Sequence, residues 1–249
     1  GVDIVVASGN TEDKSGGGQY APGSAAATGI IAALKAAIGT ALPERAAVGL
    51  AYTTPEGTER LSRFVFDYAR RNGRRKVTIS VKGSGVNYVD ALFLSTARTV
   101  AQEFPDIECD YEVIDTLCLQ LVRRPQHFDV LLLPGGYGDL ISDLCAGLIG
   151  GIGLAAGSNY GESAAVFEAA HGSAPKYAGQ DKANPMAMIL SAALLLRHIG
   201  EPAAANRVEA AVAAQLAAGR CLTYDVAPTP DAVAGTRAVA EAIARRVRG

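Results

Sequence analysis

The sequence contains no tryptophan, few aromatic residues and no excess of charge of either sign. Its 23 lysines and arginines nearly balance 25 aspartates and glutamates, which leaves a net charge of −2 at pH 7. Because no broad basic face is available to meet phosphates, we do not expect a nucleic acid as the principal partner. The 249 residues are 49% hydrophobic, which is ample for a buried core and excludes extensive disorder.

Cysteine is also scarce: Cys109, Cys118, Cys145 and Cys221 are the only four, and none forms a Cys-x-x-Cys pair. This spacing favours neither a disulfide framework nor a zinc or thioredoxin-type site. We expect buried, reduced thiols in an intracellular, cytoplasmic protein.

Long hydrophobic runs are missing as well. The longest uncharged run, Leu144–Gly161, contains six glycines and an asparagine, so it predicts loops rather than a membrane-spanning helix, and no membrane association is expected. The first residues show neither the charged nor the apolar region of a secretory signal. The chain begins with Gly-Val rather than methionine, which hints that Gly1 is not the native start.

What is present is an alternation of apolar runs with segments of helical periodicity, which predicts an α/β fold. We expect strands at residues 3–7, 47–53, 76–81 and 128–133. Helices are expected at residues 25–42, from 54 onward, and at 90–103, 139–148, 185–198, 203–217 and 231–247. Ser24 and Thr54 are expected to cap two of these helices, the second with Pro55 in its first turn.

Three acids are candidate metal ligands. Asp139 and Asp143 lie four residues apart at the start of an expected helix, so both carboxylates share one face and can converge on one cation. The alternative is that Asp139 caps the helix, where its charge suits the dipole. Asp115 stands inside an apolar stretch, and a buried carboxylate needs a partner or a metal; a helix cap is again the alternative.

Lys82 is a candidate active-site residue because it follows the β-branched strand 76–81 and precedes Gly83. α/β proteins place their active-site residues at such strand ends, although a solvated lysine is the plainer interpretation.

The segment 171–185, HGSAPKYAGQDKANP, has the composition of a loop that wraps a nucleotide. Its backbone N–H groups and Lys176 would meet phosphate, and His171 would lie on adenine. The segment lacks the GxGxxG pattern, so a Rossmann site is not indicated, and a structural turn is the alternative.

These segments resemble, in order along nearly the whole chain, the motifs of the isocitrate and isopropylmalate dehydrogenase family of decarboxylating β-hydroxyacid dehydrogenases. The most specific match is HGSAPKYAG with ANP at residues 171–179 and 183–185. Further matches are NTED at 10–13, ERLSRFVFDYAR at 59–70, YEVIDTLCLQLVRRP at 111–125, GDLISD at 138–143 and ILSAALLLRHIG at 189–200.

The resemblance implies an isocitrate/isopropylmalate dehydrogenase-like two-domain α/β fold whose large domain is incomplete. Residues 1–150 would form the small dimerisation and catalytic domain, and residues 151–249 the C-terminal part of the large nucleotide-binding domain. The family's N-terminal segment, with its carboxylate-binding arginines, has no counterpart in this sequence. The expected partners are a small 2-hydroxy acid and a second subunit, in a homodimer or a hetero-oligomer with a related chain.

The resemblance also implies a role for each matching position. Asp139 and Asp143 match acids that hold Mg²⁺ or Mn²⁺, while Asp115, the third metal acid, and Lys82, the general acid–base, reach over from the other subunit. The positions that match nucleotide-binding loops are His171, Gly172, Ser173, Ala174, Asn184 and Asp225. Lys176, Tyr177 and Tyr224 match positions that meet the 2′-phosphate in NADP-dependent members, so NADP is expected, with NAD as the alternative.

Several catalytic positions depart from the family. Ser8 stands where the arginine for the substrate carboxylate belongs, and Ser15 where the catalytic tyrosine belongs, with Tyr20 as a nearby substitute. Ser84 stands where the family has an asparagine two residues after the lysine, and Gly135 where it has an asparagine before the metal helix. Pro228 stands where it has a cofactor arginine. We therefore weigh three functions: oxidative decarboxylation of an isocitrate-like acid, a non-catalytic or regulatory subunit that keeps the nucleotide and metal sites, and an isopropylmalate- or tartrate-type dehydrogenase.

Overall fold

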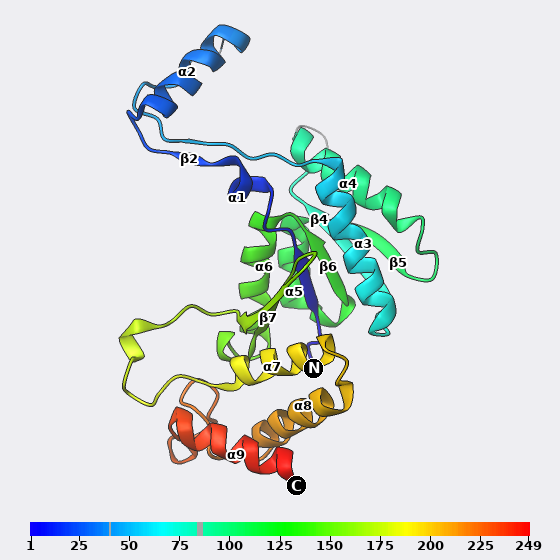
Figure 1. Ribbon diagram of the computed structural model, residues 1–249, viewed down its shortest axis with the longest axis vertical. Coiled ribbons are helices and arrows are strands. Elements are labelled where there is room, and N and C mark those ends of the chain that lie inside the picture. The colour runs from blue at the N-terminus through cyan, green and yellow to red at the C-terminus, as the bar shows by residue number, and fades with distance from the viewer. Residues whose placement is uncertain (40, 84–86) are drawn as a thin grey trace. The chain divides into compact units, whose positions relative to one another are not determined.

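The computed structural model describes residues 1–39, 41–83 and 87–249 and divides the chain into two compact units, Gly1–Cys145 and Ala146–Gly249 (Figure 1). The division falls inside helix α6 (Gly135–Leu148). Each unit has a hydrophobic core of its own, so each is described by itself.

A parallel sheet of four strands forms the centre of the first unit (Figure 1). The strands are β1 (Val5–Ser8), β6 (Val130–Leu133), β4 (Lys76–Val81) and β5 (Glu108–Val113), in that spatial order. Val77 of β4 pairs with Val130 on one side and Cys109 on the other. Because parallel strands end at the same edge of a sheet, the residues that follow them come together there.

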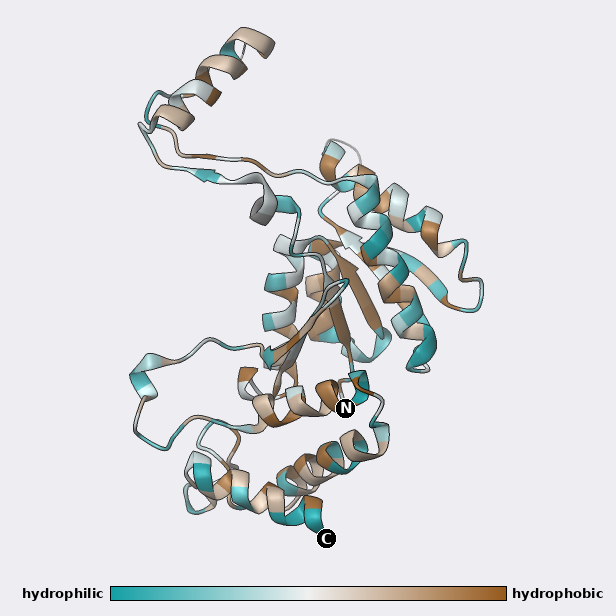
Figure 2. Cartoon of the chain, in the orientation of Figure 1, coloured by the Kyte–Doolittle hydropathy of each residue, from teal (hydrophilic) through white to brown (hydrophobic). Residues whose placement is uncertain are grey.

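Strand β4 shows that the sheet is covered on both faces. Val77, Ile79 and Val81 are fully buried in a core shared with helices α3 (Pro55–Arg71) and α4 (Tyr88–Ala101). Since side chains alternate along a strand, Thr78 and Ser80 are buried on the opposite face. Helix α5 (Ile114–Arg123) contacts β4 and β5, and the inner strand β6 is hydrophobic throughout, as Figure 2 shows.

The helices of this unit begin at residues that can cap them. The Thr54 hydroxyl accepts a hydrogen bond from the N–H of Gly57 at 3.0 Å, which starts α3 as the sequence predicts. The Asn87 carboxamide accepts hydrogen bonds from the N–H groups of Val89 and Asp90, at 3.1 and 3.3 Å. Helix α4 therefore begins at Tyr88, two residues before the expected start.

A separate segment of the first unit carries α1 (Asp13–Gly17), β2 (Gln19–Tyr20), α2 (Ala25–Ile38) and β3 (Val48–Gly49). Ser24 caps α2 as predicted, and its hydroxyl accepts from the N–H of Ala27 at 3.2 Å. The helix ends at Ile38, before the expected residue 42, because Gly39 takes a left-handed φ of 70° and closes it. The expected strand 47–53 shrinks to β3, since only β2 pairs with it.

The second unit combines an antiparallel pair, β7 (Ala156–Tyr160) and β8 (Ala165–Ala169), with three longer helices. These are α7 (Met186–His198), α8 (Pro202–Ala217) and α9 (Thr236–Arg248), and Met186, Val239 and Ile243 lie in the core that they enclose. Single turns of 3₁₀ helix occur at Pro125–His127 (η1), Ile152–Leu154 (η2), Pro175–Tyr177 (η3) and Pro230–Ala232 (η4). Across the three described ranges, no helix combines the length and hydropathy that a membrane span needs.

The structure confirms the predicted α/β class and the strand at 76–81, and it corrects other expectations. β5, α5 and the β7–β8 pair were not predicted, although Cys109, Tyr111 and Val113 alternate with charged residues along β5. All four cysteines are free, but only Cys145 is buried, so the expectation of four buried thiols was wrong.

Candidate functional site

Lys82 and Asp115 form the central ion pair of the first unit, at the carboxyl edge of the sheet. The Lys82 ammonium, directly after β4, lies 2.6 and 2.7 Å from the two carboxylate oxygens of Asp115, in the first turn of α5. The hydrogen bond from Lys82 holds the pKa of Asp115 below its usual range. Both side chains are exposed, so Asp115 is not the buried acid expected, and it makes no cap bond.

A buried carboxylate fixes the backbone that carries Lys82. Asp90, in the first turn of α4, is only 3% exposed. Its Oδ2 accepts hydrogen bonds from the backbone N–H of Lys82 at 3.0 Å, from Gly83 at 3.3 Å, and from the Tyr137 hydroxyl of α6 at 3.2 Å. Burial, together with the Asp90 charge, raises the pKa of Tyr137 to about 12. Asp90 therefore joins the end of β4 to the start of α6.

The start of α6 is held by the loop after β1. Asp13 has a left-handed φ of 60°, unusual for a non-glycine residue, and its carboxylate accepts a hydrogen bond from the N–H of Gly136 at 2.8 Å. A Cβ on Gly135 would lie 2.3 Å from the carbonyl oxygen of Gly9. Glycine at position 135, where the resemblance places an asparagine, thus lets the Gly9 carbonyl approach the start of α6 closely.

Ser8 ends β1 and packs directly against α6. A Cβ on Gly138 would lie 2.2 Å from the Cβ of Ser8, so the two positions leave no room for a larger pair. The resemblance places an arginine at this position, and the serine found there packs against α6. Another guanidinium reaches the following loop, because Arg60 of α3 donates to the Thr11 hydroxyl at 3.4 Å.

Asp139 and Asp143 occupy one exposed face of α6. Because α6 begins at Gly135, Asp139 lies in its second turn, so the alternative that it caps the helix was wrong. Within the described ranges, neither carboxylate has an ion-pair or hydrogen-bond partner. Nor does any cluster of three acidic, histidine or cysteine ligands occur in that part of the single chain. The structure thus brings together Asp139 with Asp143, and Lys82 with Asp115, as two separate pairs.

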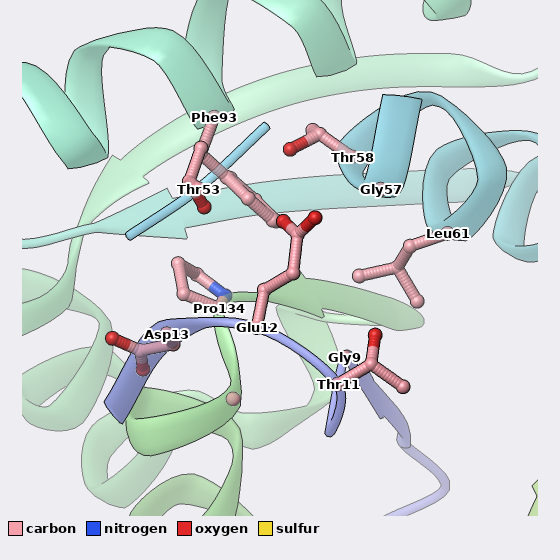
Figure 3. Close-up of a pocket in the computed structure, with 11 residues that line it drawn as sticks. Gly9, Thr11, Glu12, Asp13, Thr53, Gly57, Thr58, Leu61, Phe93 and Pro134 are labelled. Atoms are coloured by element: carbon pink, nitrogen blue, oxygen red, sulfur yellow. The ribbon is translucent and has the colours of Figure 1, made fainter. Parts of the chain in front are cut away.

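A small cavity of about 30 Å³ lies beside the carboxyl edge of the sheet (Figure 3). Its lining includes Thr11, Glu12 and Thr58, and the Thr58 hydroxyl is buried without a partner among the described residues. Glu12 accepts hydrogen bonds from the hydroxyl and, at 3.0 Å, the N–H of Thr54, so it ties the NTED loop to the cap of α3. The cavity has room for about one water molecule.

The remaining departures from the family fall elsewhere. Tyr20, the suggested substitute for the catalytic tyrosine, pairs with Val48 in the β2–β3 ladder and does not line this cavity. Ser84 and the side chain of Ser15 lie outside the described residues.

In the second unit, four side chains from the loop after β8 and the segment after α8 form a cationic aromatic cluster. The Tyr224 hydroxyl donates to that of Tyr177 at 3.1 Å, and this bond, followed by Lys176, holds the pKa of Tyr177 below its usual value. The Lys176 ammonium lies 4.8 Å from the Tyr177 ring centre. Lys182 lies 4.6 Å from the Tyr224 ring centre and 5.2 Å from that of Tyr177, which is within the range of cation–π attraction.

The same loop is anchored at its end. The buried Asn184 donates to the Asp225 carboxylate at 3.0 Å and accepts from the N–H of Met186 at 2.9 Å, at the start of α7. A Cβ on Gly153 would come within 2.8 Å of both Asn184 and Asp225. The structure thus brings Asn184 and Asp225 together, and their role in nucleotide binding stays a prediction.

The loop's other predicted nucleotide positions are less constrained. The His171 ring bonds to the carbonyl of Gly172 at 2.9 Å, Ser173 is exposed, and Ala174 has a left-handed φ of 45°.

Sequence reasoning missed Asp90, Tyr137 and Lys182. Asp90 lies three residues after Asn87, which is the spacing of an acid in the first turn of a helix, so its helical position could have been predicted. Nothing local links Tyr137 to Asp90, 47 residues away.

Three comparisons with known proteins indicate the family to which the chain belongs. The profile of the isocitrate/isopropylmalate dehydrogenase family matches residues 1–243. A probable mitochondrial alpha subunit of NAD isocitrate dehydrogenase from Caenorhabditis elegans is 47% identical over 176 residues, which cover 71% of this chain and 49% of that protein. A mitochondrial regulatory subunit of NAD isocitrate dehydrogenase from Dictyostelium discoideum is 45% identical over 70% of this chain and 49% of its own length.

The fold is similar to a solved structure over its whole length. The crystal structure of isocitrate dehydrogenase from Methylococcus capsulatus superposes with a TM-score of 0.85 and 40% identity, covering 100% of this chain and 71% of that one. This chain spans about half the length of the curated relatives it matches. The motifs, the family profile and the fold agree: the chain belongs to the isocitrate/isopropylmalate dehydrogenase family.

Proposed function

We propose that this protein, paired with a second copy or a related subunit, catalyses the metal- and NADP-dependent oxidative decarboxylation of an isocitrate-like 2-hydroxy acid. The observation that supports the proposal most is the Lys82–Asp115 ion pair at the carboxyl edge of the sheet, with both side chains exposed. A proton-transfer lysine and an acid, held together and open to solvent, are suited to complete a site on a neighbouring subunit.

The donor set suits a divalent cation. Asp139 and Asp143 present unpaired carboxylates on one face of α6, and carboxylate oxygens are the ligands that Mg²⁺ and Mn²⁺ prefer. Because no third ligand joins them within the described part of one chain, the proposal assigns Asp115 of a second subunit to complete the set. A bound cation would supply Lewis-acid polarisation of the substrate oxygen at C2.

Lys82 is the residue that we assign to proton transfer. It would take the proton of the substrate hydroxyl while the C2 hydrogen leaves as hydride to the nicotinamide, and then return a proton during release of CO₂. Asp115 holds its ammonium form in place between these steps. Asp90 fixes the backbone from which the lysine extends.

The cofactor preference rests on the cationic aromatic cluster of the second unit. Lys176 and Lys182 place two positive charges beside the paired hydroxyls of Tyr177 and Tyr224, which suits a phosphate monoester such as that of NADP. The two curated relatives from Caenorhabditis elegans and Dictyostelium discoideum are NAD proteins, so NADP is this chain's proposed departure from them.

A second candidate is a regulatory subunit that binds nucleotide and metal without turnover. Ser8 and Ser15 replace an arginine and a tyrosine of the chemical step, and Ser8 is packed against Gly138. The relative from Dictyostelium discoideum is itself named a regulatory subunit.

Calorimetric titration of the full chain with NADP⁺, MgCl₂ and isocitrate, paired with turnover followed as NADPH absorbance, separates the two candidates. Turnover that falls by about 10²–10⁴-fold in Lys82→Met supports the enzyme. Lys35→Met is the matched control on the exposed helix α2. Mg²⁺-dependent binding without turnover supports the regulatory subunit. If isocitrate does not bind at any Mg²⁺ concentration, and Asp139→Asn leaves Mg²⁺ binding unchanged, both candidates are wrong.

A further inference from the structure

The second unit contains an open pocket that the proposed reaction does not use. It has a volume of about 330 Å³ and lies where the end of α8 and the following turn meet α9. Its lining residues are Gln215, Arg220, Cys221, Ala242, Arg245 and Arg246. Three of these six side chains are guanidinium groups, and none of the predicted substrate, metal or nucleotide residues is among them.

The three arginines have no carboxylate partner in the part of the chain that the structure describes. Within the described ranges, no acid lies within 4.0 Å of Arg220, Arg245 or Arg246, although five of the chain's other arginines are ion-paired in this way. Glu241, one turn before Arg245 on α9, does not pair with it. Three exposed like charges that line one pocket without a counter-charge repel one another, and a bound anion relieves this repulsion.

A buried glutamine builds the floor of the pocket. Gln215 is 3% exposed, and its amide donates to the carbonyl oxygens of Arg220 at 2.9 Å and Cys221 at 3.0 Å. Its oxygen accepts from Nε of Arg246 at 2.8 Å, so the terminal amino groups of that guanidinium stay available. Cys221 has a left-handed φ of 53°, unusual outside glycine, and Gln215 secures the strained turn.

The helix dipole does not account for this arrangement by itself. Cations in the last turn of α9 suit its C-terminal dipole, which explains Arg245 and Arg246. It does not explain why Arg220, from another segment, lines the same pocket, or why Gln215 fixes the orientation of Arg246. Arg245 and Arg246 also lie beyond residues 1–243, which match the family profile.

We propose that this pocket is a binding site for a small polyanion, a molecule with two or more phosphate or carboxylate groups. Guanidinium groups recognise such oxygens through paired, charge-assisted hydrogen bonds. The volume falls in the range of small-molecule sites and exceeds what a single inorganic ion fills. Because the pocket lies wholly within the second unit, the proposal does not depend on the proposed dehydrogenase reaction.

Calorimetric titration of the full chain with pyrophosphate, and separately with citrate, tests the site at constant ionic strength set with chloride. We expect saturable binding of at least one of these probes, weakened by added salt. Binding of pyrophosphate alone assigns phosphate chemistry, and binding of citrate alone assigns carboxylate chemistry. If neither probe binds, the proposal is wrong.

Variants locate the binding. Arg220→Gln and Arg246→Gln should each weaken it by about 10-fold, since each removes charged hydrogen bonds. Arg207→Gln, on the exposed surface of α8, is the matched control for the same loss of charge. If Arg207→Gln weakens binding equally, the anion meets only a diffuse positive surface, and the proposal fails.

Two further variants distinguish binding in this pocket from binding at the nucleotide loop. Gln215→Met leaves the net charge unchanged but removes the floor, so binding should weaken as much as in Arg246→Gln. Circular dichroism confirms that the variant is folded, and unchanged affinity in a folded Gln215→Met contradicts a built site. Lys176→Gln, in the cationic aromatic cluster, should leave binding unchanged; a loss there would move the probe to the nucleotide loop and overturn the assignment.

Discussion

The two units hold their functional side chains by different means. In the first, buried or strained carboxylates bind backbone N–H groups: Asp90 binds the N–H groups of Lys82 and Gly83, and Asp13 binds that of Gly136. In the cationic aromatic cluster of the second, side chains hold one another, with Lys182 beside the rings of Tyr177 and Tyr224. The first arrangement fixes the path of the chain, and the second fixes only side-chain positions.

This difference predicts how each region responds to change. A buried carboxylate with three donors cannot be removed without freeing a backbone segment, so one substitution should displace the catalytic group. Exposed cation–π and ion pairs contribute little individually, so substitutions in the second unit should have graded effects. Substitutions in both units can test that contrast.

Removing Asp90 should have the largest effect. In Asp90→Ala the N–H groups of Lys82 and Gly83 and the Tyr137 hydroxyl lose their shared acceptor. A displacement of the lysine by about 1 Å is enough to lower kcat by about 100-fold. KM for the cofactor should stay unchanged, because its proposed residues lie in the other unit.

The position of Lys82 can also be followed without turnover. A trace amount of an amine-reactive reagent labels the lysine, and mass spectrometry measures the rate of labelling. Asp115→Asn breaks the ion pair directly and sets the largest increase in labelling. Asp90→Ala should approach that increase, and Asp90→Asn should fall between. The control Asp67→Asn, at a partly exposed carboxylate on the outer face of α3, should match the parent. Equal labelling of Lys82 in Asp90→Ala and the parent would show that the carboxylate does not position it.

The packing between Ser8 and α6 should respond next most strongly. Gly138→Ala places a Cβ 2.2 Å from the Cβ of Ser8, and overpacking of this kind costs about 1–3 kcal/mol in the free energy of unfolding. Denaturant unfolding measures the loss. Ser8→Gly in the same chain should restore most of it, whereas Ser8→Gly alone should have a small effect. Additive losses in the double variant would contradict the contact.

The same contrast shows which features were readable from sequence. Strand 76–81 and the shared helix face of Asp139 and Asp143 were predicted correctly, because β-branched runs and the i, i+4 spacing are local signals. The role of the two acids as metal ligands stays a prediction. Asp115 was wrongly expected to be buried. In α5 the side chains of Leu117 and Leu121 face the core while Asp115 projects outward, so apolar neighbours in sequence did not mean an apolar environment.

The link between Asp90 and Tyr137 could not be read from the sequence for a different reason. It depends on two parallel strands ending at the same edge, which brings residues 47 positions apart within 3.2 Å. The role of Lys182 was missed because Lys176 and Lys182 look alike in sequence. Only the folded loop shows that Lys182 contacts both tyrosine rings, whereas Lys176 contacts one.

In the second unit, Lys182→Gln should reduce NADP⁺ affinity by about 10-fold, since it removes one charged contact to a phosphate. NAD⁺, which lacks that phosphate, should bind with unchanged affinity. Fluorescence titration with both cofactors measures the ratio, and Arg207→Gln controls for loss of charge. A parallel loss for both cofactors would show that Lys182 supports the loop as a whole and does not select NADP.

The smallest effect concerns thiol reactivity, which compares the interior of the first unit with the surface of the second. Burial raises the pKa of Cys145 to about 11, while Cys221 is partly exposed in the strained turn of the second unit. Because the thiolate is the reactive form, only about one in a thousand Cys145 thiols is ionised at pH 8. We expect Cys145 to react with a disulfide reagent after Cys221, at a rate that rises about tenfold per pH unit up to about pH 11. Cys145→Ser should remove the slow phase alone, and guanidinium should abolish the difference. Rapid modification of Cys145 in the folded protein would mean that α6, which carries Asp139 and Asp143, opens far more often than its packing implies.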